Sequence, residues 1–160
     1  MSFDPATDPR AFRDALGAFA TGVTVVTTQT PDGPVGITAN SFASVSLDPP
    51  LVLWSPAKSS RRFHHFAEAD RFAIHVLGAD QRHICEAFTR DKHAFDGIDW
   101  HAGEDGTPLI ENTLARFECT LDAAHDAGDH LIIVGRVRRA DTRPGAPLLF
   151  AGGAYQRLAG

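Results

Sequence analysis

Three hydroxyl groups and three cations lie within eight residues of this chain, in the segment Ser55-Pro-Ala-Lys-Ser-Ser-Arg-Arg62. The segment follows an apolar run that predicts a strand, and it precedes a helical pattern that we expect to begin at Ser59 and Ser60. Free N–H groups at a helix start favour an anion, and hydroxyl and guanidinium groups add donors. The segment therefore indicates a phosphate site. A serine cap with its cations in solvent accounts for the same residues, and the pattern leaves both interpretations open.

Small and hydroxyl side chains crowd a second segment, Thr38-Ala-Asn-Ser-Phe-Ala-Ser-Val-Ser46, which we interpret as extended chain. Small side chains let a flat ligand approach the backbone, whose N–H and C=O groups can bond the edge of the ligand. The alternative is an exposed strand edge that polar residues protect from pairing. Taken alone, this segment favours the alternative.

Two further motifs place an aromatic ring beside a glycine. His130 begins a predicted strand after Gly128-Asp129, where it could lie at the mouth of a barrel, and a surface histidine is the alternative. Tyr155 follows Gly152-Gly153, which permit close backbone approach, so its ring could lie over another ring. Taken alone, a core tyrosine after a hairpin turn is the favoured interpretation.

Motifs for several other chemistries are absent from the sequence. There is no GxGxxG after a strand, no HExxH, no GxSxG and no CxxC. Residues 17–22 have the outer glycines of a phosphate loop, but Val23 stands where lysine is required. His64 and His65 are adjacent, so on a helix they point about 100° apart. We therefore expect no metal site.

Length and composition narrow the classes of protein to which this chain could belong. With 160 residues, we expect a single domain over 1–160. The net charge of −5 disfavours nucleic-acid binding, and no apolar run approaches the ~20 residues of a membrane span. Cys85 and Cys119 are too few for a disulfide scaffold, and the N-terminus lacks a signal layout. We therefore expect a cytoplasmic protein that binds neither nucleic acid nor membrane.

Short strands dominate the elements that must position these motifs. Helical spacing of apolar residues predicts helices over 9–17, 59–69 and 80–90. β-Branched or alternating runs predict strands over 22–28, 34–47, 51–55, 71–77, 114–121, 129–138, 148–150 and 154–158. Most connections are too short for a parallel crossover. The fold class we expect is mainly β, an antiparallel barrel or curled sheet with short helices over its ends.

The four motifs, in this order, resemble those of the short-chain flavin reductase family. The same family is indicated by the segments FRDALGAFATGVTVVTT, SLDPPLVLWS, RFAIHVL and PLLFAGGAYQRL. The resemblance runs from about Phe12 to Leu158. It implies the FMN-binding split barrel, a Greek-key β-barrel that forms a homodimer. It also implies reduction of FMN, or of FAD, by NADH or NADPH. Many members supply reduced flavin to a separate flavin-dependent monooxygenase.

The resemblance also assigns roles to individual residues. The family's stretch that lines the flavin ring and ribityl chain matches Thr38, Ala39, Asn40, Ser41 and Ser46. Its phosphate-end segment matches Ser55, Ser59, Ser60 and Arg61, and an aromatic position near the flavin matches Phe88. His130 and Tyr155 match positions beside the nicotinamide, where His130 positions the nicotinamide or its pyrophosphate and is not the main base.

The sequence departs from the family at His75, where many relatives have asparagine, and at Arg61-Arg62, where threonine is frequent. Other functions on the same fold stay open. The chain could retain FMN and reduce a corrinoid or a ferric chelate, or it could bind flavin or heme without catalysis. A relative of the pyridoxamine-phosphate oxidases is disfavoured, because the TANSF and GDH motifs are those of the reductases.

Overall fold

The computed structural model describes residues 1–159, and its main element is a sheet of seven strands. The strands are β2 (Thr24–Thr30), β3 (Gly33–Ala39), β4 (Ala43–Leu47), β5 (Pro50–Trp54), β6 (Arg71–Val76), β9 (Ala115–Ala127) and β10 (His130–Thr142). They lie in the order β3-β2-β6-β9-β10-β5-β4, and every neighbouring pair is antiparallel. The expected mainly-β antiparallel fold is confirmed.

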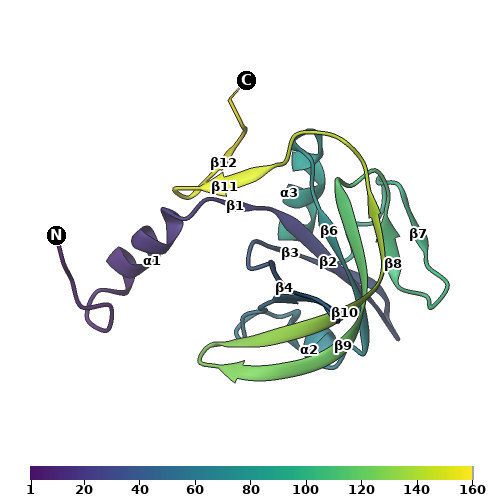
Figure 1. Ribbon diagram of the computed structural model, residues 1–160, viewed down its shortest axis with the longest axis horizontal. Helices are drawn as coiled ribbons and strands as arrows, with labels where there is room; N and C mark the ends of the chain where they lie inside the picture. Colours follow the sequence, from purple (N-terminus) through teal and green to yellow (C-terminus); the bar gives the residue numbers. More distant parts are fainter. Residues whose placement is uncertain (160) are drawn as a thin grey trace.

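The sheet must curl, because its two edge strands follow each other in the chain. Residues 40–42 alone connect β3 to β4. Laid flat, seven strands about 4.8 Å apart would separate these edges by roughly 29 Å. The connection from Ala39 to Ala43 reaches at most about 14 Å. The sheet therefore closes into a barrel with a seam between β3 and β4 (Figure 1).

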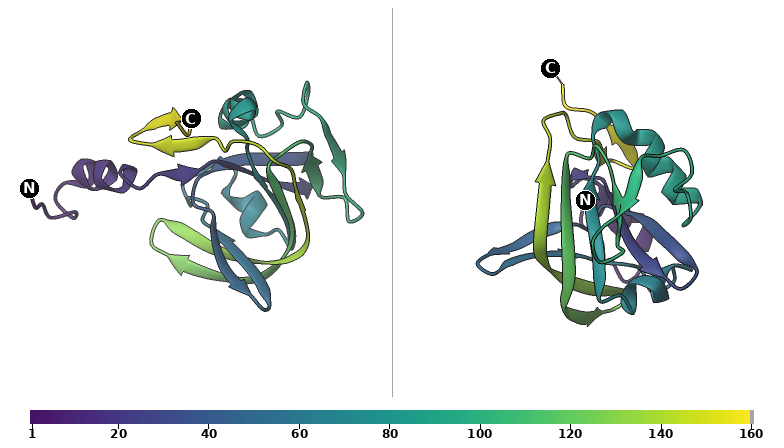
Figure 2. Two further views of the ribbon diagram at one scale, coloured as in Figure 1. Left: turned by 45° about the horizontal axis from the view of Figure 1, so that its top comes forward. Right: turned by 90° about the vertical axis from the view of Figure 1, so that its right-hand side faces the viewer.

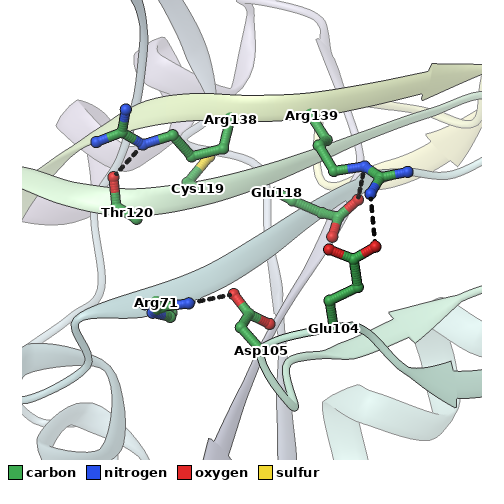
Figure 3. Close-up of a pocket in the computed structure, with 8 residues that line it drawn as sticks. All are labelled: Arg71, Glu104, Asp105, Glu118, Cys119, Thr120, Arg138 and Arg139. Atoms are coloured by element: carbon green, nitrogen blue, oxygen red, sulfur yellow. Dashed lines mark hydrogen bonds and ion pairs between the residues drawn. The ribbon is translucent and has the colours of Figure 1, made fainter.

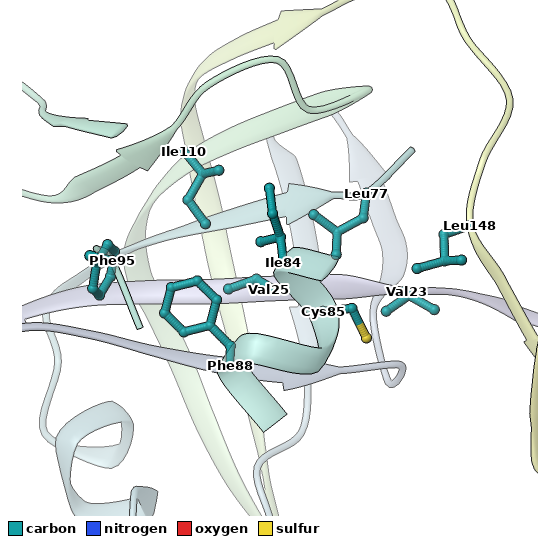
Figure 4. Close-up of a cluster of buried hydrophobic side chains, with 9 residues drawn as sticks. All are labelled: Val23, Val25, Leu77, Ile84, Cys85, Phe88, Phe95, Ile110 and Leu148. Carbon is teal, nitrogen blue, oxygen red and sulfur yellow. The ribbon is translucent and has the colours of Figure 1, made fainter. Parts of the chain in front are cut away.

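Two apolar clusters pack on opposite faces of β2. Helix α2 (Phe63–Ala67) brings Phe66 into one cluster, where its ring lies edge-on to Trp54 with 5.2 Å between centroids. On the other face, helix α3 (Arg82–Arg90) packs Ile84, Cys85 and Phe88 against β2 (Figure 4). Because β2 is buried on both faces, its sequence is a continuous β-branched run.

Shorter elements surround the barrel. They are the 3-10 helix η1 (Ala79–Gln81), the hairpin of β7 (Trp100–Ala102) and β8 (Pro108–Ile110), and a small sheet in which β11 (Leu149–Ala151) lies between β1 (Thr21–Gly22) and β12 (Ala154–Gln156). Helix α1 (Pro9–Gly17) projects from the barrel beside this small sheet (Figures 1 and 2). The Gly152 N–H donates to the carbonyl of Gly17 at 2.8 Å. None of the helices that the structure describes is long and apolar enough to cross a membrane.

The structure corrects several predicted bounds. The helix expected over 59–69 is shorter in the structure, where α2 begins at Phe63 and ends at Ala67. Ser59 and Ser60 therefore lie in the preceding turn and cap no helix. The stretch 34–47 is two strands, because residues 40–42 cross the seam. The strands expected over 114–121 and 129–138 continue as a long hairpin to Ala127 and Thr142. The helix over 9–17 is confirmed, and its cap is Asp8, whose carboxylate accepts from the Ala11 N–H at 3.0 Å.

Candidate functional site

Two cavities meet at Thr38, near the end of β3. The first, which we call the seam cavity, has a volume of about 160 Å³. It is lined by Val23, Thr38, Ala39, Asn40, Phe150 and Tyr155. The second, which we call the Arg61 cavity, has a volume of about 390 Å³. It is lined by Ile37, Thr38, Ser60, Arg61, Arg62, Phe88 and Thr89. The structure thus brings the hydroxyl-rich strand and the cationic segment of the sequence to one place.

Thr38 is fixed between these cavities by α3. Its Oγ1 donates to the carbonyl of Cys85 at 2.9 Å, and Thr89 Oγ1 donates to the same carbonyl at 2.9 Å. The end of β3 therefore stays at a set distance from α3. Asn40, the next polar residue along the chain, is exposed at the rim of the seam cavity.

Ser41 and Ser55 tie the two motifs together across the barrel seam. The Ser55 N–H donates to Ser41 Oγ at 2.9 Å, and Ser41 Oγ donates to the Ser55 carbonyl at 3.3 Å. Ser41 and Ser55 are both partly buried. The Ser41 hydroxyl is therefore occupied in holding the connection between β3 and β4 against the end of β5.

The adjacent arginines Arg61 and Arg62 have different environments. The Arg62 guanidinium donates to the carbonyls of Gly36 at 3.1 Å, Thr89 at 3.4 Å and Phe88. Burial lowers the pKa of Arg62, although Asp91 opposes this shift. Arg61 is exposed, and among residues 1–159 it makes no hydrogen bond or ion pair. Arg62 therefore joins β3 to the end of α3, and Arg61 is the cation that remains available to an anion.

His130 lies beside the same cationic segment. The first residue of β10, it forms an antiparallel bridge with Ala57, and the Lys58 N–H donates to the Asp129 carbonyl at 2.9 Å. The ring Nδ1 of His130 is 2.7 Å from Asp129 Oδ1. This hydrogen bond lowers the pKa of Asp129. The half-exposed imidazole is thus oriented by its own turn.

Tyr155 forms a wall of the seam cavity. Cys85 Sγ donates to the Tyr155 hydroxyl at 3.1 Å, and the Phe150 ring lies edge-on with 5.4 Å between centroids. The hydrogen bond to Cys85, aided by burial, raises the pKa of Tyr155. The neutral phenol is therefore held in one place at the edge of the cavity.

Five of the expected site residues line neither cavity: Ser41, Ser46, Ser55, Ser59 and His130. Ser46 lies opposite Leu51 on the β4–β5 hairpin and lines neither cavity, and Ser59 is exposed in its turn. The Phe88 ring is fully buried, so close behind β3 that a Cβ at Gly36 would lie 2.6 Å from it. Phe88 thus supports the wall of the Arg61 cavity from behind.

No sequence motif indicated a third cavity, which is lined by Arg71, Glu104, Asp105, Glu118, Cys119, Thr120, Arg138 and Arg139. Its volume is about 480 Å³, and Figure 3 shows Arg71 and Arg139 pointing toward its carboxylates. Arg71 pairs with Asp105 at 3.3 Å, and Arg139 pairs with Glu104 at 3.3 Å and Glu118 at 3.8 Å. Arg138 donates to Thr120 Oγ1 at 2.9 Å instead. The lining holds three arginines and three carboxylates, so this ion-pair cavity carries no surplus charge for a ligand. Residues 1–159 hold no cluster of three side chains suited to a metal ion.

Comparisons with known proteins agree on one family. The model of the flavin reductase like domain matches residues 16–159. The FMN reductase (NADH) SmoA of Agrobacterium fabrum is 65% identical over 149 residues, which cover 93% of this chain and 86% of that protein. HsaB of Mycobacterium tuberculosis, a reductase subunit of a flavin-dependent monooxygenase, is 43% identical over 92% of this chain and 81% of that protein. The solved NADH:FAD oxidoreductase of Streptomyces globisporus has a TM-score of 0.92 and 40% identity, covering 100% of this chain and 92% of that chain.

Proposed function

Because the chain belongs to the flavin reductase-like family, we propose that it reduces FMN with NADH at the two cavities that meet at Thr38. The resemblance inferred from the sequence motifs is thereby confirmed. The observation that carries the assignment of the site is the juxtaposition of the end of β3, with the exposed Asn40 that follows it, and the free guanidinium of Arg61.

The residues present suit a flat ring that carries a phosphate tail. The seam cavity offers small side chains and backbone at Ala39 and Asn40, and the ring of Tyr155 closes one side. The Arg61 cavity offers the Ser60 hydroxyl and the Arg61 guanidinium, which is the donor set that a phosphate needs. No carboxylate lines either cavity to repel that phosphate.

The chemistry that we propose asks little acid–base work of the protein. When bound, the flavin supplies a ring that accepts a hydride, and the protein supplies binding and orientation. Neither cavity is lined by a carboxylate or an imidazole, as expected where no proton must be exchanged with the protein. Thr38, Ala39 and Asn40 fix the plane of the ring, and Arg61 with Ser60 fixes its tail.

We propose that His130 positions the nicotinamide dinucleotide, because it lies beside residues 55–58 with its ring oriented by Asp129. His130→Ala is then expected to raise the KM for NADH about tenfold while the Kd for FMN changes less than twofold. Steady-state kinetics and flavin fluorescence titration measure the two quantities. Equal constants in the variant and the parent would remove His130 from the site.

We further propose a flavin-dependent monooxygenase as the partner that consumes the reduced flavin. The support is the similarity to HsaB, a subunit of such an enzyme.

We also propose that two copies of this chain pair through α1. This helix buries none of its residues: Phe12 and Leu16 are 44% and 59% exposed, and Phe19, just beyond its end, is 79% exposed.

Purification without added flavin, followed by NADH and NADPH oxidation with riboflavin, FMN and FAD in turn, tests the reaction. We expect NADH to be consumed with FMN, and the protein to lose flavin on gel filtration. Flavin that stays bound would favour a flavoprotein that reduces another acceptor. Absence of NADH consumption with every flavin would overturn the proposed function.

A further inference from the structure

A further cavity adjoins the seam cavity at Tyr155. Its volume is about 540 Å³, and it is lined by Ala79, Arg82, Leu148, Tyr155, Gln156 and Arg157. Tyr155 lines both cavities, so the two are neighbours that share one wall. We call this space the Arg82 cavity.

The Arg82 cavity carries an excess of positive charge. Two of its lining residues are arginines and none is a carboxylate. Arg82 uses its Nε to bind Glu86 at 2.8 Å, which leaves the two terminal amino groups of its guanidinium free of hydrogen bonds among residues 1–159. The nearby Asp80 is bound by Arg143, at 2.9 and 3.2 Å. The ion-pair cavity of Figure 3, with its matched charges, is the opposite case.

These cations are held at fixed positions relative to the seam cavity. Arg82 is the first residue of α3, and its guanidinium carbon lies 4.9 Å from the centroid of the Tyr155 ring. The same ring is fixed by its hydrogen bond to Cys85, one turn further along α3. Arg157 donates to the Ala79 carbonyl at 3.4 Å, a long bond that a stronger acceptor can replace.

The three cavities therefore form a row with a cationic group at each end. The Arg61 cavity and the seam cavity share Thr38, and the seam cavity and the Arg82 cavity share Tyr155. A mononucleotide flavin has one phosphate, which the Arg61 cavity accounts for. A second cationic site beside the ring cavity fits the diphosphate of a dinucleotide, since guanidinium groups bind phosphate oxygens in pairs.

We propose that Arg82 and Arg157 bind the diphosphate of NADH, whose nicotinamide lies against the flavin ring in the seam cavity. The inference rests on the proposed function for the presence of that flavin ring. The Arg61 cavity already accounts for the flavin tail, so the diphosphate at the other end of the row is assigned to NADH.

The test compares ligands with and without the diphosphate. In the double variant Arg82→Gln/Arg157→Gln we expect the KM for NADH to rise about tenfold more than the KM for reduced nicotinamide mononucleotide, which lacks the diphosphate. Fluorescence titration compares the Kd of FAD with that of FMN in the same variant. A selective loss for NADH supports the inference, and a selective loss for FAD would overturn it by placing the flavin dinucleotide at this site.

Arg90→Gln is the matched control, because Arg90 also lies on α3 near Glu86 but lines none of the three cavities. Arg90→Gln should leave the KM for NADH and the Kd of FAD at their parental values. Equal effects of the double variant on ligands with and without the diphosphate would overturn the inference. If the double variant does not fold, the single variant Arg157→Gln takes its place in the same comparison.

Calorimetric titration with ADP-ribose separates this inference from the proposed function, since it needs no catalysis. Binding to the parent that weakens about tenfold in the double variant supports the site even if NADH is never oxidised. ADP-ribose that binds both proteins equally, or neither, counts against the site whatever the activity.

Discussion

His75 is a buried histidine whose two ring nitrogens are both bonded to backbone. Nδ1 lies 2.9 Å from the Val25 carbonyl, and Nε2 accepts from the Ile110 N–H at 3.0 Å. The ring is therefore neutral, with its proton on Nδ1. Burial lowers its pKa to about 3, the Val25 carbonyl opposes the shift, and the charge of Arg116 adds to it.

This geometry predicts a dependence of stability on pH. The unfolded chain has a histidine pKa of about 6.5 and takes up a proton that the folded protein excludes. The free energy of unfolding should therefore fall as the pH drops below 6.5, by up to about 1.4 kcal/mol per pH unit for one proton. Urea unfolding of His75→Gln between pH 5 and 8 should show a lower free energy of unfolding that depends less steeply on pH. Substitution of the exposed His125 in His125→Gln should leave the parental pH dependence. An unchanged pH dependence in His75→Gln would contradict the assignment.

Arg61 and Arg62 predict opposite outcomes of the same substitution. Arg61→Gln should weaken FMN binding about tenfold, leave riboflavin binding unchanged and leave stability unchanged, because it removes only a free cation. Arg62→Gln should lower the free energy of unfolding by about 1–3 kcal/mol, since it leaves carbonyls of β3 and α3 unpaired. Flavin titration and urea unfolding measure the two effects. A loss of stability in Arg61→Gln, or equal losses for both flavins, would contradict this division of roles.

At the scale of elements, the contact between β3 and α3 sets the position of the site. A Cβ at Gly36 would lie 2.6 Å from the Phe88 ring, while one at Gly22 would meet nothing within 4 Å. Gly36→Ala should therefore push β3 away from α3 and destabilise the protein by about 1–3 kcal/mol. Gly22→Ala is the control and should stay near the parent in thermal unfolding. Parental stability in Gly36→Ala would show that Phe88 yields to the methyl group.

Sequence patterns predicted the elements better than their ends. The β-branched run of β2 and the alternation in β9 are local signals, so these strands were placed correctly. The helix start at Ser59 was wrong because Ala57 pairs with His130 and the Lys58 N–H donates to the Asp129 carbonyl, and both of these partners are distant in sequence. Likewise, no local signal distinguishes Arg61 from Arg62, because only the fold brings the carbonyls of Gly36 and Thr89 to one of them. Arg82 and Arg157 were missed for the same reason.

At the scale of the whole molecule, α1 extends an apolar face away from the barrel (Figure 2). Phe12 and Leu16 lie one turn apart on that face, and Asp14 lies about 200° around the helix from each. Phe12→Ser/Leu16→Ser should convert a dimer to a monomer, because exposed apolar side chains of this size are stabilised mainly by burial in an interface. Light scattering on gel filtration measures the mass, and Asp14→Ser is the control that should leave it unchanged.

The catalytic consequence of losing the interface follows from the hydrogen bond between Gly152 and Gly17. Loss of the interface frees the hairpin that carries Tyr155, so the monomer should bind NADH more weakly. A parent protein that is already monomeric would contradict the proposed pairing, and a monomeric variant with parental NADH kinetics would show that the interface does not support the site.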